Sequence, residues 1–180
     1  MYAFESDAFA SPNEASILAG AAEPYVAGSV RRAMVFVRDE GSVFDAPLDE
    51  VWTFVGSRDH HSAAHAHRRT ERRALAEHVG QYSWEQEFDG GAVRFSMRWT
   101  AFAPLGVAYE VLEGPFAGSK FFLYYEPIGA RTRVAVVGEF VSPTLPAGEI
   151  EPAVRRFFER EFEQDHAAIR RDLGRAGPNP

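Results

Sequence analysis

The fold is decided by the segment Asp89-Gly90-Gly91-Ala92-Val93-Arg94-Phe95-Ser96-Met97-Arg98-Trp99-Thr100. Its first three residues are a hairpin signal, because aspartate and glycine tolerate the positive φ angles of a tight turn. After the turn, large apolar side chains alternate with polar ones, which predicts a strand with one face against a core. The residues from Tyr82 to Phe88, before the turn, alternate in the same way. The two segments are therefore predicted to pair as an antiparallel hairpin.

The pattern of strands extends over residues 72–141, where short segments containing glycine and proline separate the apolar runs. Besides the hairpin, it predicts strands at Val107 to Leu112, Ser119 to Glu126 and Thr132 to Val141. Such short connections are typical of an antiparallel meander, because parallel strands need long crossovers.

The segments that flank the meander predict another strand and three helices. Residues 31–45 predict one long or bent strand, and Pro47 then opens a short helix that Gly56 ends. The histidine-rich stretch that follows is predicted as a second short helix or a loop. A single long helix is predicted from about Glu149 to Leu173, where Gly174 ends it.

This order of elements predicts an α+β architecture. A sheet with one apolar face must be covered, and the C-terminal helix is the only element long enough to do so. We therefore predict a helix-grip fold, in which a curved antiparallel sheet of six or seven strands wraps around the long C-terminal helix. Two short helices follow its first strand. The expected domain spans residues 29–174, with a loosely ordered extension at 1–28 and a tail at 175–180.

The composition excludes several classes of function. The chain has 180 residues and a net charge of -7, which argues against a nucleic-acid partner because such proteins neutralise phosphates. It contains no cysteine, so an iron–sulfur cluster and disulfides are excluded. No apolar run approaches the roughly 18 residues of a membrane span, and the N-terminus does not resemble a signal peptide. We expect a cytoplasmic protein that is a monomer or a homodimer.

Three features of the chain carry a resemblance to a known superfamily. They are the strand-to-helix junction from Phe44 to Trp52, the strand end Tyr124-Tyr125-Glu126-Pro127, and the closing helix. Over about residues 30–173 the chain resembles the START/Bet v1-like superfamily, also called SRPBCC or polyketide-cyclase-like. The resemblance implies a cavity between sheet and helix that takes lipids, hormones, polyketides or aromatic substrates. The aromatic residues expected to line it, besides forming the core, are Trp84, Phe95, Trp99, Phe121, Tyr125, Phe158 and Phe162.

The long helix contains an acidic residue where an apolar one is expected. Its buried stripe is formed by Val154, Phe158, Phe162, Ile169 and Leu173. The missing member of this stripe is Asp165. An ionised carboxylate that faces a core is costly unless it is paired, hydrogen-bonded or bound to a metal. Pairing with an arginine would make Asp165 structural, and coordination of a metal would make it functional.

Four of the six histidines lie close together, at positions 60, 61, 65 and 67. In a helix, His61 and His65 stand one turn apart, whereas His60 lies about 100° around from His61. We therefore expect one of that adjacent pair to face inward. Two histidines and a carboxylate suit non-haem iron, or zinc with an open position. We predict a divalent metal, iron or zinc, at His60 or His61, His65 and Asp165, against the alternative of a purely structural cluster.

The resemblance to two metal-using relatives bears on this prediction. The catalytic domains of Rieske-type oxygenases have two histidines after the first helix and an aspartate on the C-terminal helix. His60 and His65 match that spacing, and the residues from Phe162 to Asp165 resemble the sequence around that aspartate. The residues upstream of the histidines do not match, and the sequence has no electron-delivering cluster domain. The diacetylphloroglucinol hydrolases hold zinc with histidines and glutamates, a role that His166, Glu161 and Glu85 or Glu87 would fill here without matching the spacing.

These observations leave several functions open. One is a metal-dependent enzyme of hydrolase, lyase or oxygenase type, acting on a small apolar or aromatic substrate. In it His166 or the strand glutamate Glu110 would be the catalytic group that moves protons. The alternatives are a non-catalytic carrier of a hydrophobic ligand and a metal-free cyclase. His67, His78 and the arginines at positions 68, 69, 72 and 73 are expected on the surface.

Overall fold

The computed structural model describes residues 34–57, 60–65 and 67–172. Its elements are, in chain order, β1 (Met34–Phe44), α1 (Leu48–Gly56), α2 (His60–Ala64), β2 (Arg68–Ala76), β3 (Val79–Phe88), β4 (Gly91–Phe102), β5 (Gly106–Glu113), β6 (Lys120–Ile128), β7 (Arg131–Val141) and α3 (Ala147–Asp172). The strands form one antiparallel sheet of seven, in the order β1-β7-β6-β5-β4-β3-β2. The predicted α+β helix-grip fold is confirmed. The expected extension and tail lie outside the described residues.

The hairpin predicted around Gly90 joins β3 to β4. Phe88 pairs with Gly91 and Trp84 pairs with Phe95, so the apolar residues of the two strands share one face. Asp89 and Gly90 both have positive φ angles, 47° and 82°. This backbone is the reason that the turn requires residues of these types.

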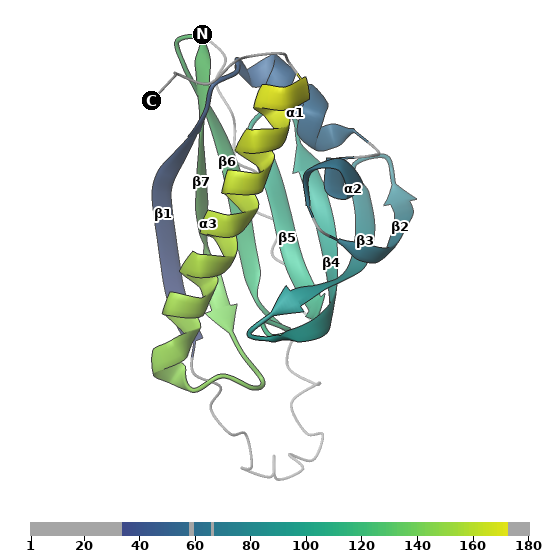
Figure 1. Ribbon diagram of the computed structural model, residues 1–180, viewed down its shortest axis with the longest axis vertical. Helices are drawn as coiled ribbons and strands as arrows, with labels where there is room; N and C mark the ends of the chain where they lie inside the picture. Colours follow the sequence, from purple (N-terminus) through teal and green to yellow (C-terminus); the bar gives the residue numbers. More distant parts are fainter. Residues whose placement is uncertain (1–33, 58–59, 66, 173–180) are drawn as a thin grey trace, which may run out of the picture. The chain divides into compact units, whose positions relative to one another are not determined.

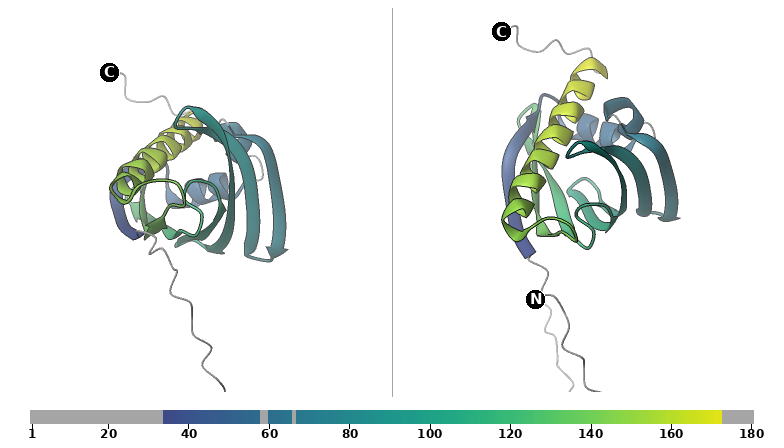
Figure 2. Two further views of the ribbon diagram at one scale, coloured as in Figure 1. Left: turned by 90° about the horizontal axis from the view of Figure 1, so that it is seen from below. Right: turned by 60° about the horizontal axis from the view of Figure 1, so that its bottom comes forward.

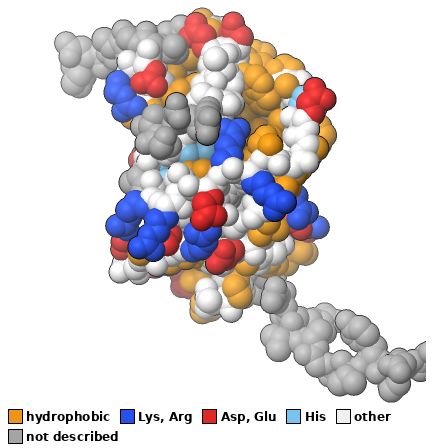
Figure 3. All heavy atoms as spheres, turned by 90° about the vertical axis from the view of Figure 1, so that its right-hand side faces the viewer, with side chains coloured by type: hydrophobic (Ala, Val, Ile, Leu, Met, Phe, Trp, Pro, Cys, Tyr) orange, Lys and Arg blue, Asp and Glu red, His pale blue; other side chains and the backbone are white. Residues whose placement is uncertain are grey.

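The strand β2 differs from the others because all nine of its residues are exposed. It pairs with β3 at the edge of the sheet. Basic and acidic side chains lie next to one another on this side of the molecule (Figure 3), and Arg69 is 3.0 Å from Glu85. Polar residues on both of its faces leave no alternation from which the strand could be delimited in the sequence.

The helix α3 crosses the concave face of the sheet (Figure 1), and the strands curve around it towards β2 (Figure 2). The apolar stripe predicted for it is buried at Val154, Phe158, Phe162 and Ile169, and Leu173 lies outside the described residues. None of the described helices is long and apolar enough to cross a membrane.

Candidate functional site

A cavity of about 400 Å³ lies between the sheet, α3 and the two short helices. Six of the seven aromatic residues expected there line it, namely Trp84, Trp99, Phe121, Tyr125, Phe158 and Phe162. Phe95 does not line the cavity, so the expectation that it contacts a ligand is wrong. Its ring is 0% exposed and stacks between those of Trp84 and Phe157, at centroid distances of 5.2 and 5.7 Å.

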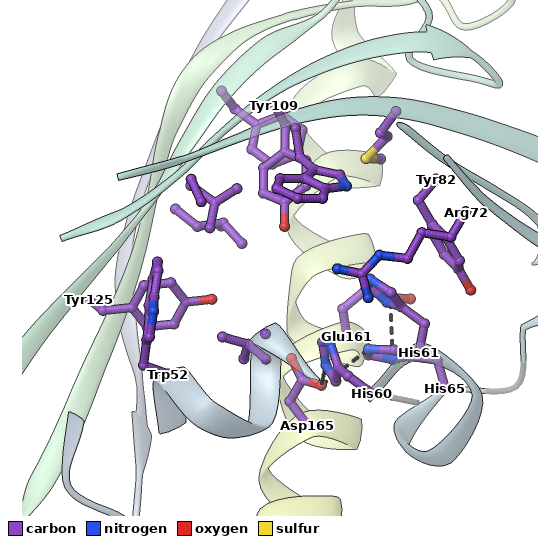
Figure 4. A pocket seen from close by; sticks show the side chains of 18 of the residues that line it. Trp52, His60, His61, His65, Arg72, Tyr82, Tyr109, Tyr125, Glu161 and Asp165 are labelled. Atoms are coloured by element: carbon purple, nitrogen blue, oxygen red, sulfur yellow. Dashed lines mark hydrogen bonds and ion pairs between the residues drawn. The ribbon is translucent and has the colours of Figure 1, made fainter. Parts of the chain in front are cut away.

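Two tyrosine hydroxyls point into this cavity from the sheet. Figure 4 shows Tyr109 and Tyr125 directed into the central space between the sheet, α1 and α3. Burial raises the pKa of both phenols, so they remain protonated hydrogen-bond donors at neutral pH. Tyr109 is not among the cavity residues predicted from the sequence. It lies two residues from both Val107 and Val111 on the same strand, so the three side chains share the inward face.

All four clustered histidines gather at one wall of the cavity. Their ring centroids lie between 4.5 and 5.8 Å apart in the pairs that make contact. His60 packs against Phe54 of α1, and His61 stacks on Tyr82 of β3 at 4.2 Å. Both members of this adjacent pair therefore face inward, which corrects the expectation that only one would. The reason is that α2 packs against both α1 and α3, while the ring of His61 reaches Tyr82 of β3.

His67 also belongs to this cluster, and the expectation that it lies on the surface is wrong. Its side chain is 3% exposed and stacks between the rings of His65 and Trp84, each at 4.8 Å. His67 directly precedes the exposed strand β2, but its own side chain lies at the cavity wall. His78 is exposed, as predicted.

Asp165 faces the same interior space and pairs with two of the histidines. Its Oδ1 lies 2.6 Å from Nε2 of His60 and 3.1 Å from Nε2 of His65. Burial by itself would raise the pKa of this carboxyl, but the charge and hydrogen bond of His60 and those of His65 hold it well below its usual range. The alternative of a structural pairing with an arginine is thus replaced by a pairing with histidines.

Glu161, one helical turn before Asp165, reaches the other side of the His65 ring. Its Oε2 lies 3.2 Å from Nδ1 of His65 and 3.6 Å from Nε2 of His67. Gln164 also places its Oε1 2.8 Å from Nδ1 of His65. Burial would lower the pKa of His65, but the hydrogen bond to Asp165 and the charge of Glu161 raise it to about 9.

The pKa values of the other two histidines, His61 and His67, shift in the opposite direction to that of His65. Burial, followed by the positive charge of His60, lowers the pKa of His61 well below its ordinary value. Burial also lowers the pKa of His67, even though Glu161 opposes the shift. His61 and His67 are therefore neutral at pH 7, with one ring nitrogen each able to accept a proton or to ligate a cation.

Several buried nitrogen atoms in the cluster have no hydrogen-bond partner among the described residues. They are Nδ1 of His60, Nδ1 of His61 and Nε2 of His67. Buried polar atoms rarely remain unpaired, and each one calls for an explanation. The same rings supply two groups of side chains whose ligating atoms lie within 4.8 Å of one another: His60, His61 and His65, and His65, His67 and Glu161. The chemistry of this wall thus suits a metal ion.

Neither residue predicted to move protons reaches the cavity. His166 lies one position away from the buried stripe of α3, and its Nε2 is 3.2 Å from Asp45. Glu110 occupies the opposite face of β5 from Tyr109 and pairs with Arg98 at 3.1 Å. The expectation that His166 and Glu110 face the cavity is therefore wrong. The helical and strand periodicities direct both side chains away from it.

Arg72 is a further correction, because it was assigned to a solvated surface. The backbone of Arg72 belongs to the exposed strand β2, yet its side chain lines the cavity (Figure 4). The guanidinium carbon lies 5.5 Å from the ring centroid of Trp99, which is a cation–π contact. It adds a positive charge to the sheet side of the cavity. No pattern in the sequence marks this side chain.

No protein-family profile and no curated protein matches the sequence. Solved structures do match the fold. The Zhui aromatase/cyclase from Streptomyces sp. R1128 has a TM-score of 0.61 at 17% identity, over 79% of this chain and 94% of that one. A START superfamily protein from Mycobacterium smegmatis has a TM-score of 0.61 at 12% identity, over 77% of this chain and 97% of that one.

The structure of Ara h 8.0201 also matches, with a TM-score of 0.60 at 13% identity, over 76% of this chain and 97% of that one. Two di-domain aromatase/cyclases also match, and the chain spans about half the length of each. Likenesses at these identities establish the fold alone. The chain has the helix-grip fold of the START/Bet v1-like superfamily, in agreement with the resemblance seen in its sequence.

Proposed function

We propose that this protein binds a small apolar or aromatic molecule in the cavity between the sheet and α3. The observation that carries this proposal is a cavity of about 400 Å³ whose walls are largely apolar and rich in aromatic side chains. Binding sites for small molecules are typically concave and apolar, with a few polar groups that fix the orientation of the ligand. The solved structures with this fold include an aromatase/cyclase, which supports a ligand of this kind.

The polar groups of the cavity favour an aromatic ligand that carries oxygen atoms. The hydroxyls of Tyr109 and Tyr125 and the guanidinium of Arg72 are donors on the sheet side (Figure 4). The histidines and Asp165 lie on the side of α2 and α3. A ligand with hydroxyl or carbonyl groups on an aromatic frame would satisfy both sides, whereas a plain hydrocarbon would leave the tyrosine donors unpaired.

Filling the cavity tests this proposal. Ala101 lines it from β4, so Ala101→Trp should occupy the ligand's space. In the wild type, an aromatic probe such as 1-naphthol at about 100 times its dissociation constant should stabilise the native state by about 2.7 kcal/mol. We expect thermal-shift measurements to show this stabilisation in the wild type and its loss in Ala101→Trp. Circular dichroism checks that the variant is folded.

Ala92→Trp is the matched control, because Ala92 lies on the same strand at an exposed position. It should bind the probe as the wild type does. Unchanged binding by Ala101→Trp would place the ligand elsewhere. A panel of hydroxylated aromatic compounds that left the melting temperature of the wild type unchanged would remove the proposal itself.

A second candidate function is a metal-dependent enzyme that acts on the bound molecule. The observation in its favour is that ligating atoms of His60, His61 and His65 lie within 4.8 Å of one another, next to Asp165. These residues fit iron or zinc, and a bound ion would polarise a carbonyl or activate water. A carrier or a metal-free cyclase would need no ion, although His65 and Asp165 would still offer acid–base groups at the cavity wall.

Elemental analysis separates these candidates. Protein purified without a histidine tag should contain close to one equivalent of iron or zinc, lost in His60→Gln but kept in His67→Gln, if this second candidate holds. Metal-free protein that regains no activity or stability on addition of either ion would leave the carrier and the metal-free cyclase.

A further inference from the structure

We propose a divalent-metal site formed by Nδ1 of His65, Nε2 of His67 and Oε2 of Glu161. It shares only His65 with the His60 or His61, His65 and Asp165 set predicted from the sequence, and it uses Glu161 together with His67, which the sequence placed on the surface. It also does not depend on the identity of the cavity ligand. The ion expected is zinc or another divalent metal that prefers imidazole together with a carboxylate.

The two distances from Glu161 fit a tetrahedral ion, and the ligating atoms of all three residues lie within 4.8 Å of one another. Zinc bonds nitrogen and oxygen at about 2.0–2.2 Å, so neighbouring ligand atoms of a tetrahedral site lie about 3.3–3.6 Å apart. Oε2 of Glu161 lies 3.2 Å from Nδ1 of His65 and 3.6 Å from Nε2 of His67. The set would need only small side-chain movements to surround an ion.

The second observation is a buried nitrogen atom without a hydrogen-bond partner at this place. The side chain of His67 is 3% exposed, and its Nε2 is buried and has no hydrogen bond among the described residues. The 3.6 Å to Glu161 is too long for a hydrogen bond. An ion between the two would satisfy the nitrogen atom and neutralise a carboxylate whose side chain is only 14% exposed.

The outer partners of the two histidines match those of metal ligands. A ligating histidine usually donates its other ring N–H to a carboxylate or another acceptor, which fixes its orientation and tautomer. Nε2 of His65 lies 3.1 Å from Oδ1 of Asp165, and Nδ1 of His67 lies 3.4 Å from the hydroxyl of Tyr82. Asp165 and Tyr82 would then be positioning residues for the two ligands.

The site would face the proposed substrate cavity. All three ligand side chains line that cavity. Three protein ligands leave a fourth tetrahedral position, which is the arrangement of catalytic zinc centres rather than closed structural ones. The amide oxygen of Gln164, 2.8 Å from Nδ1 of His65, is the polar group that an incoming ion would displace.

The test measures the binding of Zn²⁺ alone to untagged full-length protein, by competition with a chromophoric chelator. We expect one equivalent to bind to the wild type. His67→Gln and Glu161→Gln should each weaken binding more than about 100-fold. Asp165→Asn and Tyr82→Phe should weaken it by the roughly 10–100-fold that loss of an outer partner costs. Co²⁺ in place of Zn²⁺ should give the visible absorption of a tetrahedral site, and His67→Gln should abolish it.

Glu163→Gln is the matched control for Glu161→Gln, because Glu163 is exposed on the same helix, and His78→Gln serves His67→Gln. Both controls should bind zinc as the wild type does. If Glu161→Gln fails to fold, Glu161→Asp tests the same ligand with a shorter side chain and should also weaken binding. Wild-type protein that binds no zinc, or ligand variants that bind it unchanged, would overturn the site. The cavity proposal is tested separately, by binding of 1-naphthol in the presence of a chelator.

Discussion

Phe95→Ala is expected to lower the free energy of unfolding by about 3–5 kcal/mol. Phe95 is fully buried, and its ring contacts those of Trp84, Phe157 and Phe88 at centroid distances of 5.2, 5.7 and 6.0 Å. Truncation removes the ring from all three contacts. The surrounding β-sheet and α3 are held by many other contacts, so they can close the resulting void only in part. Urea denaturation followed by circular dichroism measures the loss.

The matched control is Phe36→Ala, because the side chain of Phe36 on β1 is 63% exposed. Its cost should stay below about 1 kcal/mol. A loss of less than 1 kcal/mol in Phe95→Ala would mean that this residue is not a core element. Its role as a ligand contact would then have to be reconsidered. The prediction therefore tests the division between core and cavity wall within a single aromatic cluster.

The fold could be predicted because two of its elements have strong periodicity. Residues from Val93 to Trp99 alternate with a period of two, and the stripe from Val154 to Ile169 follows the α-helical period. Each pattern places its apolar side chains on one face of the strand or helix. The apolar face of the sheet and that of the helix are both removed from water when they pack together. The bounds of the edge strand β2 could not be predicted, because neither of its faces is buried and its sequence therefore shows no alternation.

The candidate site was predicted in part. The inward direction of Asp165 followed from the helical stripe, and the gathering of His60, His61 and His65 around it agrees with that reasoning. The inclusion of His67 could not be predicted, because it depends on how the chain turns from α2 into β2. That turn is a tertiary feature with no local period.

The errors at His166 and Glu110 have a different origin. The chemistry of both side chains suits proton transfer, but the period of their elements directs them away from the cavity. Glu110 alternates with Tyr109, and His166 is about 100° from Asp165 around the helix. Applied to these positions, the same periodicity that located Asp165 would have excluded both. Arg72 is the opposite case, since a long side chain on an exposed strand can reach a cavity from its rim.

Asp165→Leu is expected to lower the free energy of unfolding by about 3–5 kcal/mol in metal-free protein. Asp165 is 8% exposed, and its Oδ1 accepts hydrogen bonds from His60 at 2.6 Å and His65 at 3.1 Å. Leucine has a similar size but no acceptor, so Nε2 of each buried imidazole would lose its partner, and His65 would keep only the partners of its Nδ1. Asp165→Asn keeps an acceptor oxygen and should cost less, about 1–3 kcal/mol. Chemical denaturation in the presence of a chelator gives both values.

A double-mutant cycle shows whether this cost arises from the histidine pair. In a His60→Gln background, Asp165→Asn no longer loses the contact with the His60 ring. Its cost should therefore fall, giving a coupling energy of about 0.5–3 kcal/mol. Glu163→Gln on the same helix should change stability by no more than about 0.5 kcal/mol. Additive costs in the cycle would show that Asp165 stabilises the fold without the His60 contact. The short 2.6 Å distance would then contribute nothing measurable, and His65 would be the partner that keeps this carboxylate buried.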